Sequence, residues 1–304
     1  MNMFVDRKSA TFIITLVNVI LFILELLGGF TTTTLLKLGA QYGPMVDAGQ
    51  YYRLITAMFL HGGFLHIFFN MYALLYLGNI VERVYSTPKF LSVYFLSGVV
   101  GNLATQIFYH NTISIGASGA IFGLVGMLFA AGRRHDIPYY LKPLTGAALL
   151  PMILVNLVLG FTAGNINNAA HIGGLLAGMA FGLLVSPRYT WRSWKRWIVV
   201  MYIITGLMIA SFLLLFLNPG GNVSEIIDFH NRYLTILSKL EMGQLVSIRE
   251  AESLKPVDWD TRKLKRKLLS HLETMKPSLE ELERDFQEWH NKILDMYKGL
   301  ITRK

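Results

Sequence analysis

The stretch Ile115-Gly116-Ala117-Ser118-Gly119-Ala120 decides how the rest of the chain is interpreted. It places one hydroxyl among small residues, at the head of an apolar segment that runs to Ala131. Ser and Gly are common where membrane helices pack closely, so Ser118 taken alone is more simply a packing residue. A serine can also serve as a nucleophile when a base lies beside it. The rest of the sequence has to decide between these two interpretations.

The composition is that of a membrane protein. Of the 304 residues, 53% are hydrophobic and only 15% are charged, and the mean hydropathy is +0.44. A soluble domain carries roughly 25% charged residues. Apolar runs of about 20 residues recur, and that length spans a bilayer core as a helix. We therefore predict an all-α polytopic membrane protein. The absence of cysteine excludes disulfides, thiolate catalysis and cysteine-bound metals.

Hydropathy predicts seven membrane spans. In chain order they are Ala10–Gly29, Phe64–Val84, Lys89–Tyr109, Ala117–Ala131, Leu144–Phe161, Ala169–Val185 and Trp197–Leu217. The first run is too long for the apolar part of a signal peptide, so we expect it to be retained. Trp191, Trp194 and Trp197 are expected to precede the last span as an interfacial aromatic belt.

We divide the chain into a six-helix membrane core (1–187), an interfacial segment with a seventh membrane helix (188–218), and a helical soluble tail (219–304). Apolar residues recur in the tail at helical spacing, which predicts two or three amphipathic helices. They are Ile226, Phe229, Tyr233, Ile236, Leu237 and Leu240, then Leu279, Leu282, Phe286, Trp289 and Ile293. These stripes form either a core or a docking face, and the sequence names no partner for the tail.

The distribution of charge predicts the topology. Alternate loops hold 11 Lys and Arg residues, whereas the opposite loops hold only Lys37 and Arg53. Cytoplasmic loops carry the excess of Lys and Arg, so the N-terminus is predicted to be cytoplasmic. With seven spans, the tail is then extracytoplasmic. Residues 222–304 carry 15 Lys and Arg against 14 Asp and Glu, a net charge of +1, so most of the protein's +9 lies around the spans and does not indicate a nucleic-acid partner.

Polar residues gather at the extracytoplasmic ends of three spans. His66 and Asn70 are one helical turn apart at the start of the second span, so they share a face. His61 precedes them in the loop, with Gly62-Gly63 making the turn into the helix. Ser118 begins the fourth span and His171 begins the sixth. Such side chains are costly inside a membrane and tend to face a cavity or a partner.

Two glycine stripes predict which spans pack together. The stripe on the sixth span is His171, Gly174, Gly178 and Gly182, and the stripe on the fourth is Gly119, Gly123 and Gly126. Small residues at this spacing let membrane helices approach closely. If the two stripes pack, Ser118 and His171 meet near the top of the contact. A Ser beside a His is the minimal activated nucleophile. We find no acidic residue at this level to orient His171, which favours a dyad over a triad.

The chain resembles the rhomboid family of intramembrane serine proteases over roughly residues 10–187. Gly116-Ala117-Ser118-Gly119 is similar to the family's GxSG motif. Two further motifs match, namely His61-x4-His66-x3-Asn70 in the second span and Ala170-His171-x2-Gly174-x3-Gly178 in the sixth. Arg53 in the first loop also matches the family's pattern. The seventh span and the tail resemble the six-plus-one arrangement of many rhomboids.

The resemblance implies a role for each matching residue. Ser118 is implied as nucleophile and His171 as general base, with His66 and Asn70 as oxyanion-hole donors and His61 as a structural hydrogen-bonding residue. Arg53, Gly116, Gly119 and Phe122 are implied as supporting residues. Two residues depart from the family's pattern: Tyr52 stands where Trp is usual, and Phe122 stands where the best-known members have Tyr. A phenyl ring can still stack on the histidine but lacks a hydroxyl.

The function predicted first is therefore an intramembrane serine endopeptidase that cleaves transmembrane segments of other proteins within the lipid bilayer, with no cofactor. The alternative is a non-catalytic rhomboid-like protein that binds or escorts transmembrane clients. A zinc site is not favoured, because His61-x4-His66 is not the spacing of a zinc-protease helix and no carboxylate accompanies it in sequence. A transporter would show inverted repeats and charges at mid-membrane, and neither is present.

Several smaller predictions complete this interpretation. Glu82 is expected to be an interfacial residue beside Arg83, and Glu25 to lie near the outer surface. The site is expected to open extracytoplasmically, with the loop Phe161–Asn168 and the top of the fifth span as candidates for a moving gate. The short N-terminal segment, which shows no organelle signal, favours a bacterial plasma membrane.

Overall fold

The computed structural model describes residues 9–47, 49–110, 112–162, 167–187, 190–217, 223–256 and 259–301. Within these ranges the chain is helical, and its only β-type pairing is the isolated bridge between Gln41 and Ser114. Five of the described helices are long and apolar enough to cross a membrane, and Ser118–Ala131 and Asn168–Leu184 are shorter apolar helices. The prediction of an all-α polytopic membrane protein is thereby confirmed.

The chain divides into two compact units. The first comprises residues 1–43 and 51–217, and the second comprises residues 44–50 and 218–304. Up to Leu217 the α-helices are α1 (Ala10–Leu27), α2 (Thr32–Lys37), α3 (Gly43–Asp47), α4 (Arg53–Thr56), α5 (Phe64–Ala73), α6 (Asn79–Tyr85), α7 (Thr87–Phe108), α8 (Ser118–Ala131), α9 (Leu150–Thr162), α10 (Asn168–Leu184) and α11 (Trp191–Leu217). Short 3₁₀ segments are η1 (Ala57–Phe59), η3 (Tyr139–Leu144) and η4 (Gly146–Leu149), and η2 (Leu74–Gly78) is a π-helical turn.

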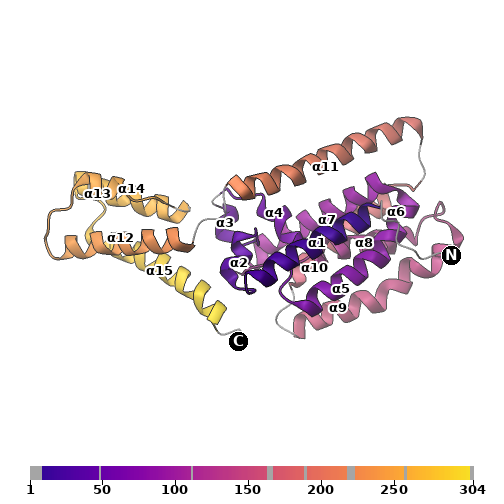
Figure 1. Ribbon diagram of the computed structural model, residues 1–304, viewed down its shortest axis with the longest axis horizontal. Helices are drawn as coiled ribbons and strands as arrows, with labels where there is room; N and C mark the ends of the chain where they lie inside the picture. Colours follow the sequence, from indigo (N-terminus) through magenta and orange to yellow (C-terminus); the bar gives the residue numbers. More distant parts are fainter. Residues whose placement is uncertain are drawn as a thin grey trace. The chain divides into compact units, whose positions relative to one another are not determined.

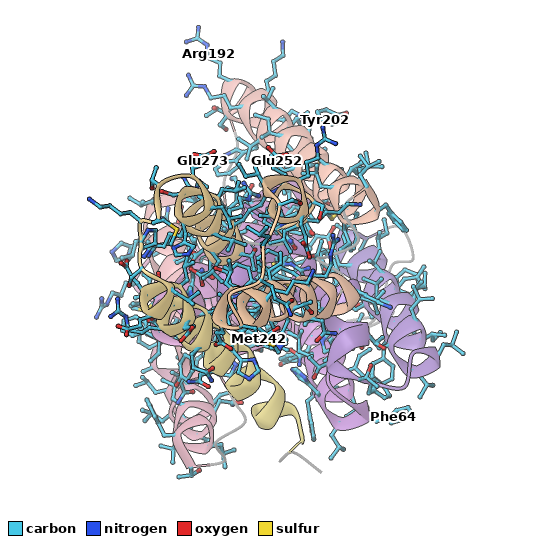
Figure 2. All side chains as sticks on the ribbon, turned by 90° about the vertical axis from the view of Figure 1, so that its left-hand side faces the viewer. Phe64, Arg192, Tyr202, Met242, Glu252 and Glu273 are labelled. Carbon is cyan, nitrogen blue, oxygen red and sulfur yellow. The ribbon has the colours of Figure 1, made fainter. Side chains whose placement is uncertain are left out.

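The helix α8 lies at the centre of the membrane unit. From Gly119 to Ala131 it is buried at every position except Phe129. A helix that is apolar all round is suited to such an interior position. It packs between α7 and α10, while α9 and α11 lie at opposite edges of the bundle (Figure 1). Phe64 of α5 and Tyr202 of α11 project outward from the bundle (Figure 2), as expected of side chains that face lipid.

Three predicted span boundaries need correction. The second span is not one regular helix, because the π-helical turn η2 joins α5 to α6. The fifth span was predicted to begin at Leu144, but the 3₁₀ segments η3 and η4 precede α9, which places Pro151 in the first turn of α9. A proline is tolerated there because the first-turn N–H groups have no partner within the helix. The last membrane helix, α11, begins at Trp191, so the three tryptophans that were predicted to precede the last span lie within that helix.

Glu82 fastens three helices at one end of the bundle. Its carboxylate accepts the main-chain N–H groups of Ala10 (2.9 Å) and Thr11 (3.0 Å), the Thr11 hydroxyl (2.7 Å) and the Thr87 hydroxyl (2.8 Å). The first N–H groups of a helix lack partners within it, and a negative charge stabilises that end. The sequence predicted only an interfacial position for Glu82, whereas the side chain joins the start of α1 to the junction of α6 and α7.

Other charged residues gather at the same end of the bundle. Arg134 bonds Asp136 in a bidentate pair at 2.8 Å, and the Ser186 hydroxyl donates to the same carboxylate at 2.6 Å. The Arg134 bond, together with the Ser186 bond, holds the pKa of Asp136 well below its usual range. The Lys89 ammonium donates to the Ser186 carbonyl at 2.6 Å. The connection between α8 and α9 is thus tied to the chain that leaves α10.

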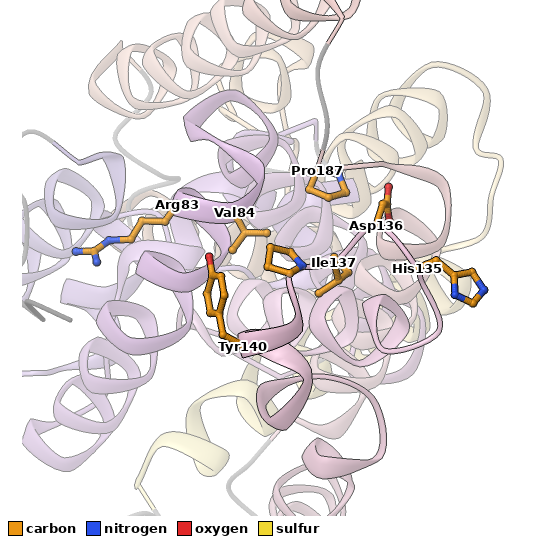
Figure 3. A pocket seen from close by; sticks show the side chains of 8 residues that line it. Arg83, Val84, His135, Asp136, Ile137, Tyr140 and Pro187 are labelled. Carbon is orange, nitrogen blue, oxygen red and sulfur yellow. The ribbon is translucent and has the colours of Figure 1, made fainter.

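This end also carries an open surface depression of about 460 Å³. Its lining residues are Arg83, Val84, His135, Asp136, Ile137, Pro138, Tyr140 and Pro187 (Figure 3). It lies beyond the C-terminal end of α8, and Ser118 begins the other end of that helix, about 20 Å away along its axis.

The second unit contains the helical tail. Its helices are α12 (Val223–Glu241), α13 (Ile248–Glu252), α14 (Trp259–Thr274) and α15 (Leu279–Ile301). The predicted apolar stripes form a core, because Phe229, Tyr233, Ile236, Leu237, Leu282, Phe286 and Trp289 are all buried. The side chains of Ile226 and Ile293, predicted in the same stripes, lie outside the described residues. Met242, by contrast, is exposed on the loop after α12 (Figure 2).

Two histidines face each other across the tail. Nδ1 of His230 on α12 lies 3.3 Å from Nδ1 of His290 on α15, and the rings are tilted by 31° with centroids 4.6 Å apart. Phe286 packs beside the His230 ring at 5.3 Å. Burial is the main cause that lowers the pKa of His230, and the charge of His290 lowers it further. A proton on both rings would therefore oppose the packing of α12 on α15.

We predict that acid loosens the tail. Because the pKa of His230 is lower in the folded tail than in the unfolded chain, the unfolded chain binds more protons. The tail therefore has its full stability above the ordinary histidine pKa, near 6.5. It loses stability as the pH falls below that value toward the lowered pKa of His230 in the folded tail. Hydrogen–deuterium exchange of α12 and α15, corrected for intrinsic rates, should be faster at about pH 5.5 than at about pH 7.5. His230→Asn should reduce that difference, whereas His135→Gln outside the tail should not. An unchanged difference in His230→Asn would contradict the prediction.

Candidate functional site

Ser118 lies at the first position of α8, on a backbone that a glycine makes possible. Gly116 has a φ of +124°, a left-handed conformation that favours glycine, and Ala117 then turns into the helix. The Gly116 N–H donates to the Ala57 carbonyl at 3.0 Å, which fixes the loop to the segment η1. At a helix start the main-chain N–H groups are not used by the helix, so they are available to a negatively charged oxygen.

His171 stands beside Ser118. Its Nε2 lies 2.9 Å from the Ser118 hydroxyl oxygen, and the side chain is only 6% exposed. The other ring nitrogen, Nδ1, is buried without a hydrogen-bond partner among the described residues. The neutral ring therefore carries its proton on Nδ1 if Nε2 is to accept from Ser118. The structure brings together the two residues that the sequence paired.

The glycine stripes make this proximity possible, as predicted. A side chain on Gly174 would overlap the Gly119 carbonyl, and one on Gly178 would overlap the Gly123 carbonyl. Farther down the contact, Gly126 in the same way abuts the Leu175 carbonyl. The backbones of α8 and α10 are thus in contact along the stripe, which agrees with the role of small residues between membrane helices.

Phe122 holds the His171 ring from the α8 side. The two rings are stacked, with centroids 4.2 Å apart and planes 10° apart. The position is one turn below Ser118, as the sequence predicted, and the stacking needs no hydroxyl. Because no carboxylate bonds Nδ1 in the described part of the chain, the ring's orientation depends on this stacking and on α10 itself.

Asn167 is a positioning residue that the sequence analysis did not single out. It caps α10, because its side-chain oxygen accepts the Ala170 N–H at 3.0 Å. Its amide also donates to the hydroxyls of Thr105 (2.7 Å) and Ser114 (2.9 Å). The start of α10, and with it His171, is thereby fixed to α7 and to the chain before Ser118. An Asn immediately before an apolar helical run is a usual capping signal and could have indicated this role.

His66 faces the loop that carries Ser118. Its Nδ1 accepts the Gly62 N–H at 3.3 Å, so in the neutral ring the proton lies on Nε2. A Cβ built on Gly116 would lie 2.8 Å from His66 Nε2 and 3.8 Å from the Ser118 hydroxyl oxygen. The absence of a side chain on Gly116 therefore lets His66 Nε2 approach the loop that carries Ser118.

Asn70 and His61 lie at the same level with different surroundings. The Asn70 amide donates to the His66 carbonyl at 2.8 Å, which leaves its second amide hydrogen for another acceptor. The His61 ring meets the His66 ring edge-on, with centroids 5.0 Å apart. His61 thus supports His66 by ring contact.

The expectation that no acidic residue reaches this level is wrong. Glu25 is fully buried, and both of its carboxylate oxygens accept the His61 N–H, at 2.9 and 3.1 Å. It binds that main-chain group and not His171. The sequence placed Glu25 near the end of the first span but could not show that this end meets the turn before α5.

Arg53 supports the first loop from within. It is completely buried, and its guanidinium donates to the carbonyls of Leu36 (2.9 Å) and Ala40 (2.7 Å). These carbonyls lie at and just beyond the end of α2, where helix carbonyls lack partners. Tyr52, which replaces the usual Trp, is buried beside it, with the Arg53 guanidinium carbon 5.5 Å from its ring centroid.

The comparisons with known proteins agree with this arrangement. Residues 48–188 match the Rhomboid domain family. RHOMBOID-like protein 2 of Arabidopsis thaliana is 32% identical over 213 residues, which cover 64% of this chain and 67% of that protein. This chain belongs to the rhomboid family. The six-helix core of the rhomboid fold, followed by α11 and the tail, is therefore the architecture of this protein.

Two further rhomboids are similar over a shorter part of the chain. Rhomboid protease GluP of Bacillus subtilis is 40% identical over 159 residues, which cover 52% of this chain and 31% of that protein. Rhomboid-like protease 1 of Toxoplasma gondii is 35% identical over 167 residues, covering 53% of this chain and 57% of that protein. The chain thus spans about a third and about half of the length of these two relatives.

Two expectations for this rhomboid concern residues away from the dyad. Half of the loop expected as a gate, residues 163–166 of 161–168, lies outside the described residues. In the part of the chain that is described, no three His, Asp or Glu side chains converge as metal ligands.

The α8–α10 contact generates a direct prediction. Gly178→Ala should place a methyl group against the Gly123 carbonyl, and such overpacking typically costs about 1–3 kcal/mol. The detergent-solubilised variant should therefore unfold at a lower temperature than the wild type. Gly206→Ala is the matched control, since a Cβ at Gly206 meets nothing within 4 Å. Equal melting temperatures for the two variants would show that the contact is not as close as the structure has it.

Proposed function

We propose that this rhomboid is an intramembrane serine endopeptidase in which Ser118 and His171 form the catalytic dyad. The observation that carries the proposal is the 2.9 Å separation of the Ser118 hydroxyl oxygen from His171 Nε2. In this mechanism the hydroxyl oxygen attacks the scissile carbonyl while Nε2 takes its proton, and the imidazolium then protonates the leaving amine. Water repeats the attack on the acyl-enzyme with the same base and releases Ser118.

The oxyanion of each tetrahedral intermediate requires hydrogen-bond donors aimed at one point. The surroundings of Gly116 support this role, because a Cβ built on Gly116 would lie within 4 Å of both His66 Nε2 and the Ser118 hydroxyl oxygen. His66 donates from Nε2, since its Nδ1 already accepts from Gly62. The free amide hydrogen of Asn70 and the main-chain N–H of Ser118 at the start of α8 supply the other donors.

The proposed substrates are transmembrane segments of other membrane proteins, cleaved within the lipid bilayer. A transmembrane helix hides its amides in internal hydrogen bonds, so a substrate has to unwind locally before Ser118 can reach a carbonyl. Small or helix-breaking residues around the scissile bond favour such unwinding. Two of the relatives, Rhomboid protease GluP and Rhomboid-like protease 1, are named as proteases, and this supports a protease for this chain as well.

We place the protein in the cell membrane with its N-terminus in the cytoplasm. The excess of Lys and Arg in alternate loops supports this orientation, since such loops remain cytoplasmic. The site opening and the tail are then extracytoplasmic. Residues 1–187 form the catalytic core in this proposal, residues 188–218 add the seventh span, and residues 219–304 form the soluble tail.

The first test uses purified protein in detergent with a panel of single-span substrates. Wild type should cleave at least one of them, whereas Ser118→Ala and His171→Ala should lose about 10⁴-fold or more of the rate, as expected when nucleophile or base is removed. A serine-directed phosphonate should label wild type and not Ser118→Ala. If wild type binds transmembrane clients without cutting or labelling, the protein is the non-catalytic alternative and the proposal fails.

The second test concerns the oxyanion donors. Asn70→Ala should lower kcat by about 10- to 1000-fold with little change in KM, as for the loss of one donor that acts in the transition state. Asn79→Ala is the matched control, because Asn79 lies in the same span and donates to the Leu75 carbonyl at 2.6 Å as Asn70 does to His66. A similar loss of kcat in both variants would assign Asn70 a packing role.

A further inference from the structure

Glu25 is a buried carboxyl group that the proposed mechanism does not use. It lies near the end of α1, is fully buried, and directs both carboxylate oxygens at one donor, the His61 N–H. A buried carboxylate is costly unless it is well hydrogen-bonded. Glu82, at the opposite end of the bundle, has four donors from three helices. Among the described residues Glu25 accepts a hydrogen bond from this donor alone. A role in holding several helices together, as for Glu82, therefore does not explain why Glu25 is buried here.

The group that Glu25 holds is the start of the turn that leads to His66. The next N–H along the chain, that of Gly62, donates to His66 Nδ1 at 3.3 Å. Glu25 fixes the backbone of His61, and the His61 ring packs edge-on against the His66 ring with centroids 5.0 Å apart. Two contacts therefore pass from the residues beside Glu25 to the His66 ring, one through hydrogen bonding and one through ring packing.

These contacts determine where the His66 proton points. While Nδ1 accepts from Gly62, the neutral ring carries its proton on Nε2, which lies close to Gly116. If the turn at Gly62-Gly63 shifted, that hydrogen bond would be lost and the ring could adopt the other tautomer. The left-handed φ of +154° at Gly63 shows that the turn has a conformation that few other residues would maintain.

We propose that Glu25 is a positioning residue for the oxyanion hole. Its hydrogen bond to the His61 N–H fixes the turn 61–63, and the turn directs the Nε2–H of His66 at the oxygen that binds above Gly116. This inference rests on the proposed protease function, and it adds a residue from the first span to a site otherwise built from α5, α8 and α10.

The kinetic test is a double-mutant cycle with His66. Glu25→Ala should lower kcat by about 10- to 100-fold with KM nearly unchanged, because a small misplacement of a catalytic group has effects of that size. In a His66→Ala background the same change should have little further effect, since Glu25 acts through His66. Glu25→Gln should retain most of the activity, because an amide oxygen can accept the same N–H.

Glu82→Ala is the matched control, since Glu82 is also a buried carboxylate that accepts main-chain N–H groups. Removing it should lower the melting temperature, and any loss of kcat should be of equal size with and without His66. If Glu25→Ala behaves in the same additive way, Glu25 is merely structural and the inference is overturned.

A spectroscopic measurement separates this inference from the proposed function. Nitrogen NMR of histidine-labelled Ser118→Ala protein should show His66 with its proton on Nε2, and Glu25→Ala should shift His66 toward a tautomer mixture. Glu82→Ala should leave the His66 signals in place. A wild type that fails to cleave or to be labelled overturns the protease, whereas an unchanged His66 tautomer in Glu25→Ala overturns the role of Glu25 even in an active enzyme.

Discussion

The site depends on one interaction, the direct contact of the α8 and α10 backbones. Lipid offers no hydrophobic force to press two apolar helices together, so the contact relies on close packing. The glycine stripes permit it, since a side chain on Gly174 or Gly178 would overlap a carbonyl of α8. Ser118 and His171 lie at the start of their helices, so their distance is set by this contact and not by mobile loops. Preorganised groups of this kind lose little energy in rearrangement when a reaction occurs.

Buried charged groups fasten the ends of the bundle around this contact. Glu82 satisfies N–H groups at the start of α1, and Arg53 satisfies carbonyls around the end of α2. Such groups have no partner within the helix, and in an apolar surrounding an unpaired one is costly. At the site, by contrast, Nδ1 of His171 is buried without a partner among the described residues. The fold thus satisfies these polar groups at the helix ends, whereas this nitrogen of the proposed base has no such bond.

The sequence predicted the parts of the site that depend on helical periodicity. The stripes that include Gly119 and Gly174 recur at a spacing that any helix reproduces, so the sequence predicted that Ser118 and His171 meet if the two stripes pack together. The contact of Glu25 with His61 could not, because it joins residues 36 positions apart through the geometry of a turn. The 3₁₀ segments before α9 were also missed, since hydropathy reports apolar length and not the hydrogen-bonding pattern within it.

The missing acid beside His171 has a physical rationale. A carboxylate on Nδ1 would orient the ring, but deep in an apolar bundle its desolvation costs several kcal/mol, which hydrogen bonds recover only when the geometry is excellent. The Phe122 ring stacks on the His171 ring with centroids 4.2 Å apart, which orients the imidazole and adds no buried charge. The capping of α10 by Asn167 fixes the helix that carries the ring. Glu25, the carboxyl group that the described residues place at this level, accepts the His61 main-chain N–H and does not bond His171.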